Sequence, residues 1–85
     1  MKSVTIYTSA LCPFCWRAVN LLKKKNIGFK EINVGMNAKL RKEMIQRSGG
    51  VTSVPQIFID EQHIGGCDEI MALERSGKLD GMLAV

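Results

Sequence analysis

The hydrophobic pattern of the first 34 residues changes from that of a strand to that of a helix and back again. This feature restricts the fold more than any other. Residues 4–7 form a short β-branched and aromatic run that predicts a strand. From residue 13 onward, apolar side chains recur at helical spacing, so we expect a helix that ends before Gly28. Residues 29–34 predict a second strand. A strand–helix–strand unit of this length implies a parallel pair of strands with a right-handed crossover.

The remaining sequence adds a helix, a hairpin and a C-terminal helical region. Asn37 is a suitable cap for a second helix, which ends at residues 48–50. Residues 56–59 and 63–64 flank a polar turn, which is typical of a hairpin. A third helix runs from residue 67 or 68 to about 75, and one more apolar turn follows. The predicted order is β-α-β-α-β-β-α, an α/β fold with one four-stranded mixed sheet flanked by helices.

Length and composition limit the class of protein. Eighty-five residues leave room for one domain, so we expect residues 1–85 to form a single domain. The hydrophobic share of 46% and the charged share of 24% are globular values that argue against disorder. No stretch approaches the roughly 20 apolar residues of a membrane span, and the first ten residues lack the apolar run of a signal peptide. We therefore expect a cytoplasmic protein with no membrane partner.

The net charge of +4 is unevenly distributed along the chain. Residues 1–50 hold ten Lys and Arg against two acidic residues, whereas residues 51–85 hold two against six. A basic half favours anionic ligands or acidic protein surfaces, although solvated helix faces explain the same lysines and arginines. Five aromatic residues leave nothing to form a stacking platform, so we expect no nucleic-acid partner.

Two of the three cysteines form a Cys-Pro-Phe-Cys sequence at residues 12–15, where the first strand gives way to the first helix. In a protein without a secretion signal, this spacing favours a redox pair. Proline is preferred at the first helical position, so Pro13 places Cys12 at the N-cap, where the helix dipole favours a thiolate. Cys15 lies three residues further on, near the same side of the first turn. We expect Cys12 to attack a disulfide and Cys15 to resolve the product.

Two other interpretations of these cysteines are open from the residues alone. Both could be small buried hydrophobes, which is a common role of cysteine. Alternatively, Cys12 and Cys15 could bind zinc together with His63 and Cys67, whose spacing resembles that of zinc ligands. The chain has a recognisable core that needs no metal to fold, so no metal is expected.

Three motifs in order resemble a dithiol glutaredoxin, most closely the short bacterial glutaredoxins. They are the Cys-Pro-Phe-Cys sequence with its following helix, residues 53–59 (SVPQIFI) and residues 63–68 (HIGGCD). The resemblance covers nearly the whole chain. It implies a thioredoxin fold and glutathione-dependent thiol–disulfide exchange, in which Cys12 is the nucleophile and Cys15 the resolving thiol.

The same resemblance implies a glutathione site. Val54 and Pro55 match a cis-proline loop whose Val backbone pairs with the cysteinyl part of glutathione, and Gly66-Cys67-Asp68 matches the segment that receives its γ-glutamyl end. Ser9 stands where many relatives have a lysine for the glycine carboxylate, so Gln46, or its neighbour Arg47, is the expected substitute. The full set of expected glutathione-binding residues is Phe14, Gln46, Val54, Pro55, Gly66, Cys67 and Asp68.

Some of these residues have a plainer alternative. Asp68 could be an ordinary helix N-cap, and Gln46 could be a solvent-facing helix residue. Cys67 is expected to contribute backbone and a small packed thiol rather than catalysis. Phe14 stands where the family usually has a tyrosine, so the hydroxyl is lost while the apolar ring remains.

The resemblance implies an enzyme that reduces protein–glutathione mixed disulfides and protein or small-molecule disulfides, with glutathione as reductant and cosubstrate. Its expected partners are glutathione and glutathionylated or disulfide-containing proteins, with a ribonucleotide reductase as one candidate, and the chain is expected to be a monomer. The alternative is a thioredoxin-like electron carrier reduced directly by a flavoprotein reductase. A third interpretation is an iron–sulfur or zinc module, against which Pro13 argues.

Overall fold

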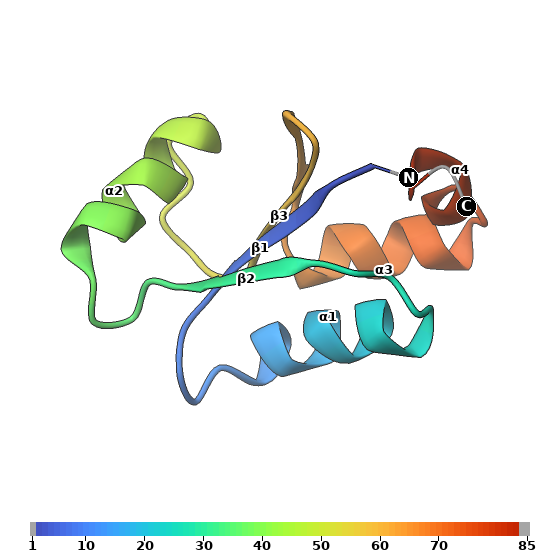
Figure 1. The fold of residues 1–85 in the computed structure, drawn as a ribbon, viewed down its shortest axis with the longest axis horizontal. Helices are drawn as coiled ribbons and strands as arrows, with labels where there is room; N and C mark the ends of the chain where they lie inside the picture. The colour runs from blue at the N-terminus through green and yellow to red at the C-terminus, as the bar shows by residue number, and fades with distance from the viewer. Residues whose placement is uncertain (1, 84–85) are drawn as a thin grey trace.

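The computed structural model describes residues 2–83 and contains one four-stranded mixed sheet (Figure 1). The spatial order of the strands is β2-β1-β3-β4, in which β1 pairs parallel with β2 and antiparallel with β3, and β3 pairs antiparallel with β4. The predicted number and order of strands are therefore confirmed. The bounds are β1 Val4–Thr8, β2 Lys30–Asn33, β3 Gln56–Ile59 and β4 Gln62–Gly65.

The helices cover both faces of this sheet (Figure 1). Helices α1, α3 and α4 contribute to one hydrophobic cluster and α2 contributes to the other, so the sheet separates two cores. Neighbouring strand residues face opposite cores, as Ile6 and Tyr7 do. The helix bounds are α1 Pro13–Lys24, α2 Ala38–Arg47, α3 Cys67–Arg75 and α4 Leu79–Leu83.

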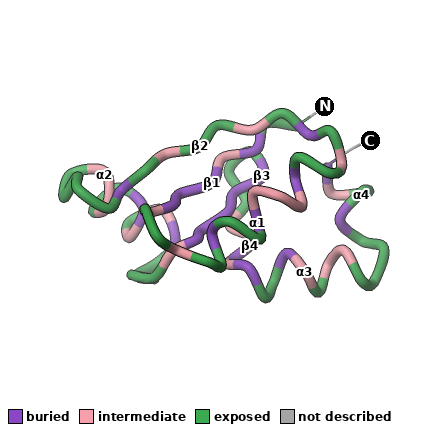
Figure 2. The backbone as a smooth tube through the Cα atoms, turned by 90° about the horizontal axis from the view of Figure 1, so that it is seen from below, coloured by how far each residue is buried: buried purple, intermediate pink, exposed green. Residues whose placement is uncertain are grey.

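The larger core lies beneath α1, α3 and α4. In Figure 2, β1 and β3 are largely purple because these central strands are covered on both faces. Lys25, just after α1, forms ion pairs with Glu74 at 2.8 Å and Asp80 at 2.7 Å, which join the end of α1 to α3 and α4. The fully or almost fully buried members of this core are Val4, Ile6, Ala18, Leu22, Ile27, Ile57, Ile59, Ile70, Leu79 and Leu83.

The smaller core attaches α2 and contains a buried polar group. Tyr7 is completely buried, and its hydroxyl donates to Glu43 Oε2 at 2.7 Å and accepts from Arg47 Nη1 at 2.9 Å. The Arg47 guanidinium also lies 4.2 Å from the centre of the Phe58 ring. Burial, followed by the hydrogen bond to Glu43, raises the pKa of Tyr7. A cation–π contact and two side-chain hydrogen bonds thus hold α2 on the sheet.

The helix starts agree with the predicted caps except at α3. Cys12 caps α1, and the Asn37 side chain accepts the Leu40 N–H at 3.0 Å to cap α2. At α3 the N-cap is Gly66, whose N–H donates to the Glu69 carboxylate at 2.6 Å. The interpretation of Asp68 as an N-cap is therefore wrong, because the helix begins at Cys67 and Glu69 supplies the carboxylate. Within residues 2–83, no helix has the length and apolar character needed to cross a membrane.

Candidate active site

Cys12 lies at the N-cap of α1 with extended backbone dihedrals, immediately before Pro13. Its Sγ accepts the Cys15 N–H at 3.2 Å and lies 4.0 Å from the carbonyl oxygen of Val54. A backbone N–H at a helix start that points at sulfur stabilises negative charge there. The half-buried Cys12 is accessible, so it is positioned to act as a nucleophile.

Cys15 is shielded from solvent, in contrast to Cys12. Only 4% of its surface is exposed. Burial, and then the hydrogen bonding with Cys12, raise the pKa of Cys15 to about 12, although a backbone hydrogen bond at Ser9 acts in the opposite direction. Cys15 is therefore a protonated thiol near neutral pH. The two cysteines are free thiols in the structure and differ in solvent access.

A groove of about 350 Å³ borders the redox pair, and we call it the Pro55 groove. It brings together six of the seven residues expected to bind glutathione, whereas Gln46 is exposed on α2 and does not line it. The Val54–Pro55 peptide bond is cis, as expected. The lining residues are Phe14, Val51, Ser53, Val54, Pro55, Gln56, His63, Gly65, Gly66, Cys67, Asp68 and Glu69.

Glycine at position 66 lets the two loops of this groove approach each other. A Cβ atom at Gly66 would lie 3.1 Å from the Pro55 carbonyl oxygen, tighter than ordinary packing allows. Next to it, Cys67 is buried, and burial raises the pKa of its thiol. Asp68 is exposed at the groove edge, on the first turn of α3. The free N–H groups of that turn and the Asp68 carboxylate could receive opposite charges of one ligand.

Sequence reasoning missed Gln56 and His63 as parts of this groove. Gln56 Nε2 donates to the Ser53 carbonyl at 3.0 Å, and His63 Nε2 lies 2.6 Å from Gln56 Oε1. This chain of contacts braces the loop that precedes Pro55. The available sequence signal was a glutamine at the start of an otherwise apolar strand. Such a glutamine is expected to be buried, as Gln56 is at 3% exposure, and a buried side-chain amide must find hydrogen-bond partners.

Neither expected substitute for the absent lysine at Ser9 is brought into the Pro55 groove. The Arg47 guanidinium is engaged by Tyr7 and Phe58, and Gln46 lies on the exposed side of α2. Glutathione binding by Gln46 stays a prediction. Within the described part of the chain, residues 2–83, no three His, Cys, Asp or Glu side chains group as a metal site would require.

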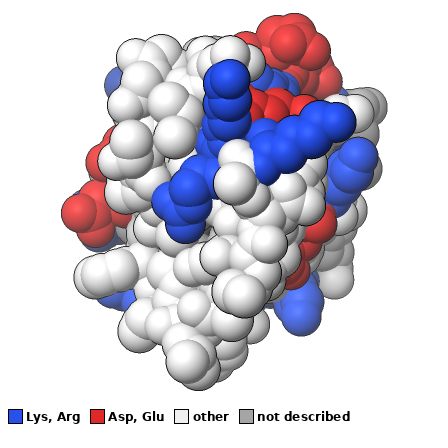
Figure 3. Space-filling model, turned by 90° about the vertical axis from the view of Figure 1, so that its left-hand side faces the viewer, with Lys and Arg blue, Asp and Glu red and all other residues white. Residues whose placement is uncertain are grey.

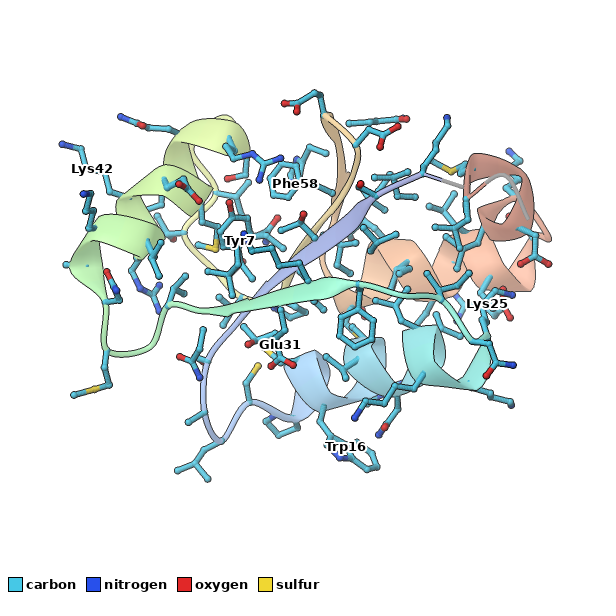
Figure 4. All side chains as sticks on the ribbon, in the orientation of Figure 1. Tyr7, Trp16, Lys25, Glu31, Lys42 and Phe58 are labelled. Carbon is cyan, nitrogen blue, oxygen red and sulfur yellow. The ribbon has the colours of Figure 1, made fainter. Side chains whose placement is uncertain are left out.

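A second groove, of about 610 Å³, lies on the other side of the redox pair, and we call it the Trp16 groove. Both Cys12 and Cys15 line it. Figure 4 shows Glu31 projecting from β2 toward the start of α1 and Trp16 projecting from that helix. The lining residues are Thr8, Ser9, Leu11, Cys12, Pro13, Cys15, Trp16, Val19, Lys23 and Glu31.

Trp16 should report the redox state of the pair. It is the only tryptophan, it is 69% exposed, and it shares the Trp16 groove with both cysteines. Because a nearby disulfide quenches indole emission, we expect reduction of a Cys12–Cys15 disulfide to raise Trp16 fluorescence. The rise should disappear in Cys15→Ser. Identical emission from both forms, with the disulfide state verified by mass spectrometry, would contradict this prediction.

Comparison with known proteins identifies the family. The glutaredoxin family model matches residues 4–64. Glutaredoxin 3 of Escherichia coli (strain K12) is 54% identical over 83 residues, a match that covers 98% of this chain and 99% of the relative. The chain belongs to the glutaredoxin family.

Solved glutaredoxin structures agree with this one in fold. The solution structure of a glutaredoxin from Brucella melitensis matches with a TM-score of 0.85 at 49% identity, over 98% of this chain and 89% of that one. The crystal structure of a buckwheat glutaredoxin–glutathione complex matches with a TM-score of 0.86 at 28% identity, over 98% of this chain and 77% of that one. The thioredoxin-like fold expected from the sequence is thus confirmed. This glutaredoxin is a glutathione-dependent thiol–disulfide oxidoreductase with Cys12 and Cys15 as its active-site pair.

Proposed function

We propose that this glutaredoxin reduces protein–glutathione mixed disulfides and protein or small-molecule disulfides through its Cys-Pro-Phe-Cys sequence. The observation that carries the proposal is the asymmetry of the pair: Cys12 is accessible and receives a backbone N–H, whereas Cys15 is buried with a pKa raised to about 12. Cys12 is therefore positioned to attack a disulfide, while Cys15 stays a protonated thiol until the resolving step. The buckwheat structure, which is of a glutaredoxin–glutathione complex, supports glutathione as cosubstrate.

Reduction of a glutathionylated protein needs only Cys12. Its thiolate attacks the glutathione sulfur, a Cys12–glutathione disulfide forms, and the protein cysteine leaves as a thiolate that takes a proton from water. The thiolate of a second glutathione then attacks the bound glutathione sulfur. The products are oxidised glutathione and regenerated Cys12 thiolate, so atoms and electrons balance.

Reduction of a protein disulfide uses both cysteines. Cys12 attacks one sulfur and the other leaves as a thiolate, which gives a mixed disulfide between enzyme and protein. Cys15 then gives its proton to the protein thiolate released in the first step, attacks Cys12 Sγ and releases the second protein thiolate, which takes a proton from water, so the enzyme ends with a Cys12–Cys15 disulfide. Because the Cys15 N–H already contacts Cys12 Sγ at 3.2 Å, the two residues are close enough for this step after a small local adjustment.

The Pro55 groove is the proposed glutathione site. Val54 presents its backbone next to Cys12, as the 4.0 Å contact between Sγ and the Val54 carbonyl oxygen indicates. Phe14 and Pro55 supply apolar walls. The first turn of α3 would receive the γ-glutamyl carboxylate on the backbone N–H groups of Cys67 and Asp68, since the Gly66 N–H is engaged by Glu69, and the Asp68 carboxylate would receive the ammonium. Gln46 remains the proposed partner of the glycine carboxylate.

Replacing Asp68 by Ala should raise the apparent KM for a glutathione mixed disulfide by about tenfold, because an ammonium group loses a charge-assisted partner at a solvent-exposed edge. The kcat should change little, because Asp68 lies on the first turn of α3 and the hydrogen bonds of Cys12 go to Val54 and Cys15. Steady-state kinetics of Asp68→Ala and Asp68→Asn measure this. Glu61→Ala, an exposed carboxylate in the hairpin turn, is the matched control. An unchanged KM with a lowered melting temperature would make Asp68 purely structural.

A coupled assay tests the proposed function as a whole. The protein is supplied with 2-hydroxyethyl disulfide, glutathione, glutathione reductase and NADPH, and NADPH oxidation is followed. Turnover is expected. If this mixture shows no turnover but thioredoxin reductase with NADPH reduces the protein directly, the thioredoxin-like carrier replaces the proposal.

Several sequence-based expectations accompany this function as proposals. They are a single domain over residues 1–85, a cytoplasmic location, a monomeric state, and glutathionylated or disulfide-containing protein substrates, with a ribonucleotide reductase as one candidate. Sedimentation equilibrium tests the monomeric state directly. Trapping substrates on Cys15→Ser, which cannot resolve a mixed disulfide with Cys12, tests the identity of the protein substrates.

A further inference from the structure

The loop that leads to the cis-proline, residues 51–55, belongs to no helix or strand, yet side chains hold three successive residues of it. These side chains come from α2, its C-cap and β3. The contacts are Val51 N–H to Ser48 Oγ at 3.2 Å, Arg41 Nη1 to the Thr52 carbonyl at 2.9 Å, and Gln56 Nε2 to the Ser53 carbonyl at 3.0 Å. Side chains therefore determine the path of the chain into Val54.

The contact made by Gln56 is more costly to break than the one made by Arg41. Figure 3 shows Lys and Arg side chains gathered on the end of the molecule where α2 lies, and Arg41 belongs to that helix. Its hydrogen bond to Thr52 is exposed, so water competes for both partners. Gln56 is only 3% exposed, and a buried amide without its partner is an unsatisfied polar group. Gln56 also holds Ser53, the residue next to Val54.

His63 fixes the orientation of the Gln56 amide. Because Gln56 Nε2 donates to the Ser53 carbonyl, Oε1 is the end of the amide that faces His63 Nε2, 2.6 Å away. A carbonyl oxygen only accepts, so His63 Nε2 must carry the proton. The His63 ring is itself held in place, because it lies against the Phe58 ring at a centroid distance of 5.0 Å and an interplanar angle of 33°. A donor on a fixed ring therefore keeps Gln56 turned toward Ser53.

The Ser53 carbonyl and the Val54 N–H belong to one planar peptide unit. This peptide is trans, since the cis bond in the described chain lies between Val54 and Pro55, so the two groups point in opposite directions. When Gln56 holds the Ser53 carbonyl, the direction of the Val54 N–H is thereby set. The Val54 carbonyl oxygen lies 4.0 Å from Cys12 Sγ. Val54 thus presents a donor and an acceptor of fixed direction beside the reacting sulfur, as strand-like pairing with an extended peptide requires.

We propose that His63 is a positioning residue for glutathione, which acts through Gln56 and the Ser53 carbonyl to hold the Val54 N–H in the direction that pairs with the cysteinyl residue of glutathione. This inference rests on the proposed function, which places glutathione in the Pro55 groove that these residues line. His63 takes no part in the exchange of thiols and disulfides. Removal of its donor should therefore weaken recognition of glutathione while the chemistry of Cys12 is unchanged.

Two exchange equilibria separate recognition of glutathione from thiol chemistry. They are measured in a Cys15→Ser parent, so that no Cys12–Cys15 disulfide can form. The Cys12 thiolate attacks one sulfur of a small disulfide, and the other sulfur leaves as a thiolate that takes a proton from water. Oxidised glutathione gives a Cys12–glutathione disulfide, whereas 2-hydroxyethyl disulfide gives a mercaptoethanol adduct with no peptide to pair with Val54. Mass spectrometry measures both equilibrium constants, and their ratio reports glutathione recognition alone.

His63→Phe keeps a ring against Phe58 but removes the donor to Gln56, and it should lower this ratio about fivefold, which is the scale of one partly buried hydrogen bond. His63→Gln keeps an N–H donor at similar reach and should restore the ratio to within about twofold of the parent. Gln56→Glu keeps an acceptor for His63 but has no donor for Ser53, so it should lower the ratio as His63→Phe does, and it replaces His63→Phe if that variant does not fold. Gln62→Ala, an exposed neighbour on β4, is the matched control and should leave the ratio unchanged.

An unchanged ratio in His63→Phe, even with a lowered melting temperature, would overturn the inference, because His63 would then act on stability alone. An equal fall of both equilibrium constants would also overturn it, since His63 would then act on Cys12 itself. The same holds if the ratio in His63→Gln is as low as in His63→Phe, or if Gln56→Glu keeps the ratio of the parent. A parent that forms the glutathione adduct no more readily than the mercaptoethanol adduct would instead refute the proposed glutathione site.

Discussion

Replacing Cys12 by Ser will abolish all disulfide exchange by this glutaredoxin, whereas Cys15→Ser will keep reduction of glutathione mixed disulfides and lose most protein disulfide reduction. The reason is the asymmetry of the pair. Cys15 is buried and its pKa is raised to about 12, so it cannot replace an absent nucleophile at neutral pH. Cys12 needs no second enzyme thiol when another glutathione molecule completes the reaction. Kinetics on 2-hydroxyethyl disulfide and on insulin separate the two pathways.

The third cysteine supplies the control for these variants. Cys67 is buried beside the Pro55 groove, and burial raises the pKa of its thiol, so Cys67→Ser should keep both activities. Equal loss of both activities in Cys15→Ser would contradict a route that uses Cys12 alone. Residual insulin reduction in Cys12→Ser that vanishes in Cys12→Ser/Cys67→Ser would show that Cys67 also attacks disulfides.

Local sequence signals predicted the helix starts and the position of the redox pair. Pro13 at the first helical position and Asn37 at a cap act within one turn, so the chain order alone determines them. The start of α3 was ambiguous because Asp68 and Glu69 are adjacent carboxylates. In the structure the extended residue Gly66 is the N-cap, and the Glu69 carboxylate accepts its N–H.

Contacts between distant segments could not be predicted in the same way. Tyr7 bonds to Glu43 and Arg47, which lie 36 and 40 positions along the chain, and strand register together with helix rotation selects these partners. The Trp16 groove has the same origin, because it forms where residues of β1, α1 and β2 meet. The sequence was enough to identify the reactive cysteine and most of the Pro55 groove. The Trp16 groove became apparent only from the three-dimensional arrangement.

Truncating Phe58 to Ala should lower the free energy of unfolding by about 3–5 kcal/mol, which is a large part of the roughly 5–15 kcal/mol of a typical domain. Phe58 is 1% exposed, its ring meets the Tyr7 ring edge-on at a centroid distance of 5.7 Å, and Arg47 covers it at 4.2 Å. Two effects add to this loss: the truncation leaves a cavity, and the Arg47 guanidinium loses its cation–π contact with the Phe58 ring. Urea denaturation followed by circular dichroism measures it, and Phe58→Leu, which refills part of the cavity, should lose less.

Phe58 should also matter more to α2 than to α1, because the sheet separates the two cores. Tyr7, Val34, Met44 and Phe58 are the buried residues beneath α2, so a cavity there weakens the attachment of that helix. Hydrogen exchange should accelerate in α2 more than in α1. Ile6→Ala, whose side chain lies in the opposite core, is the matched control and should accelerate α1 more than α2. Equal acceleration of both helices in Phe58→Ala would mean that the two cores open only together, and that α2 has no separate stability.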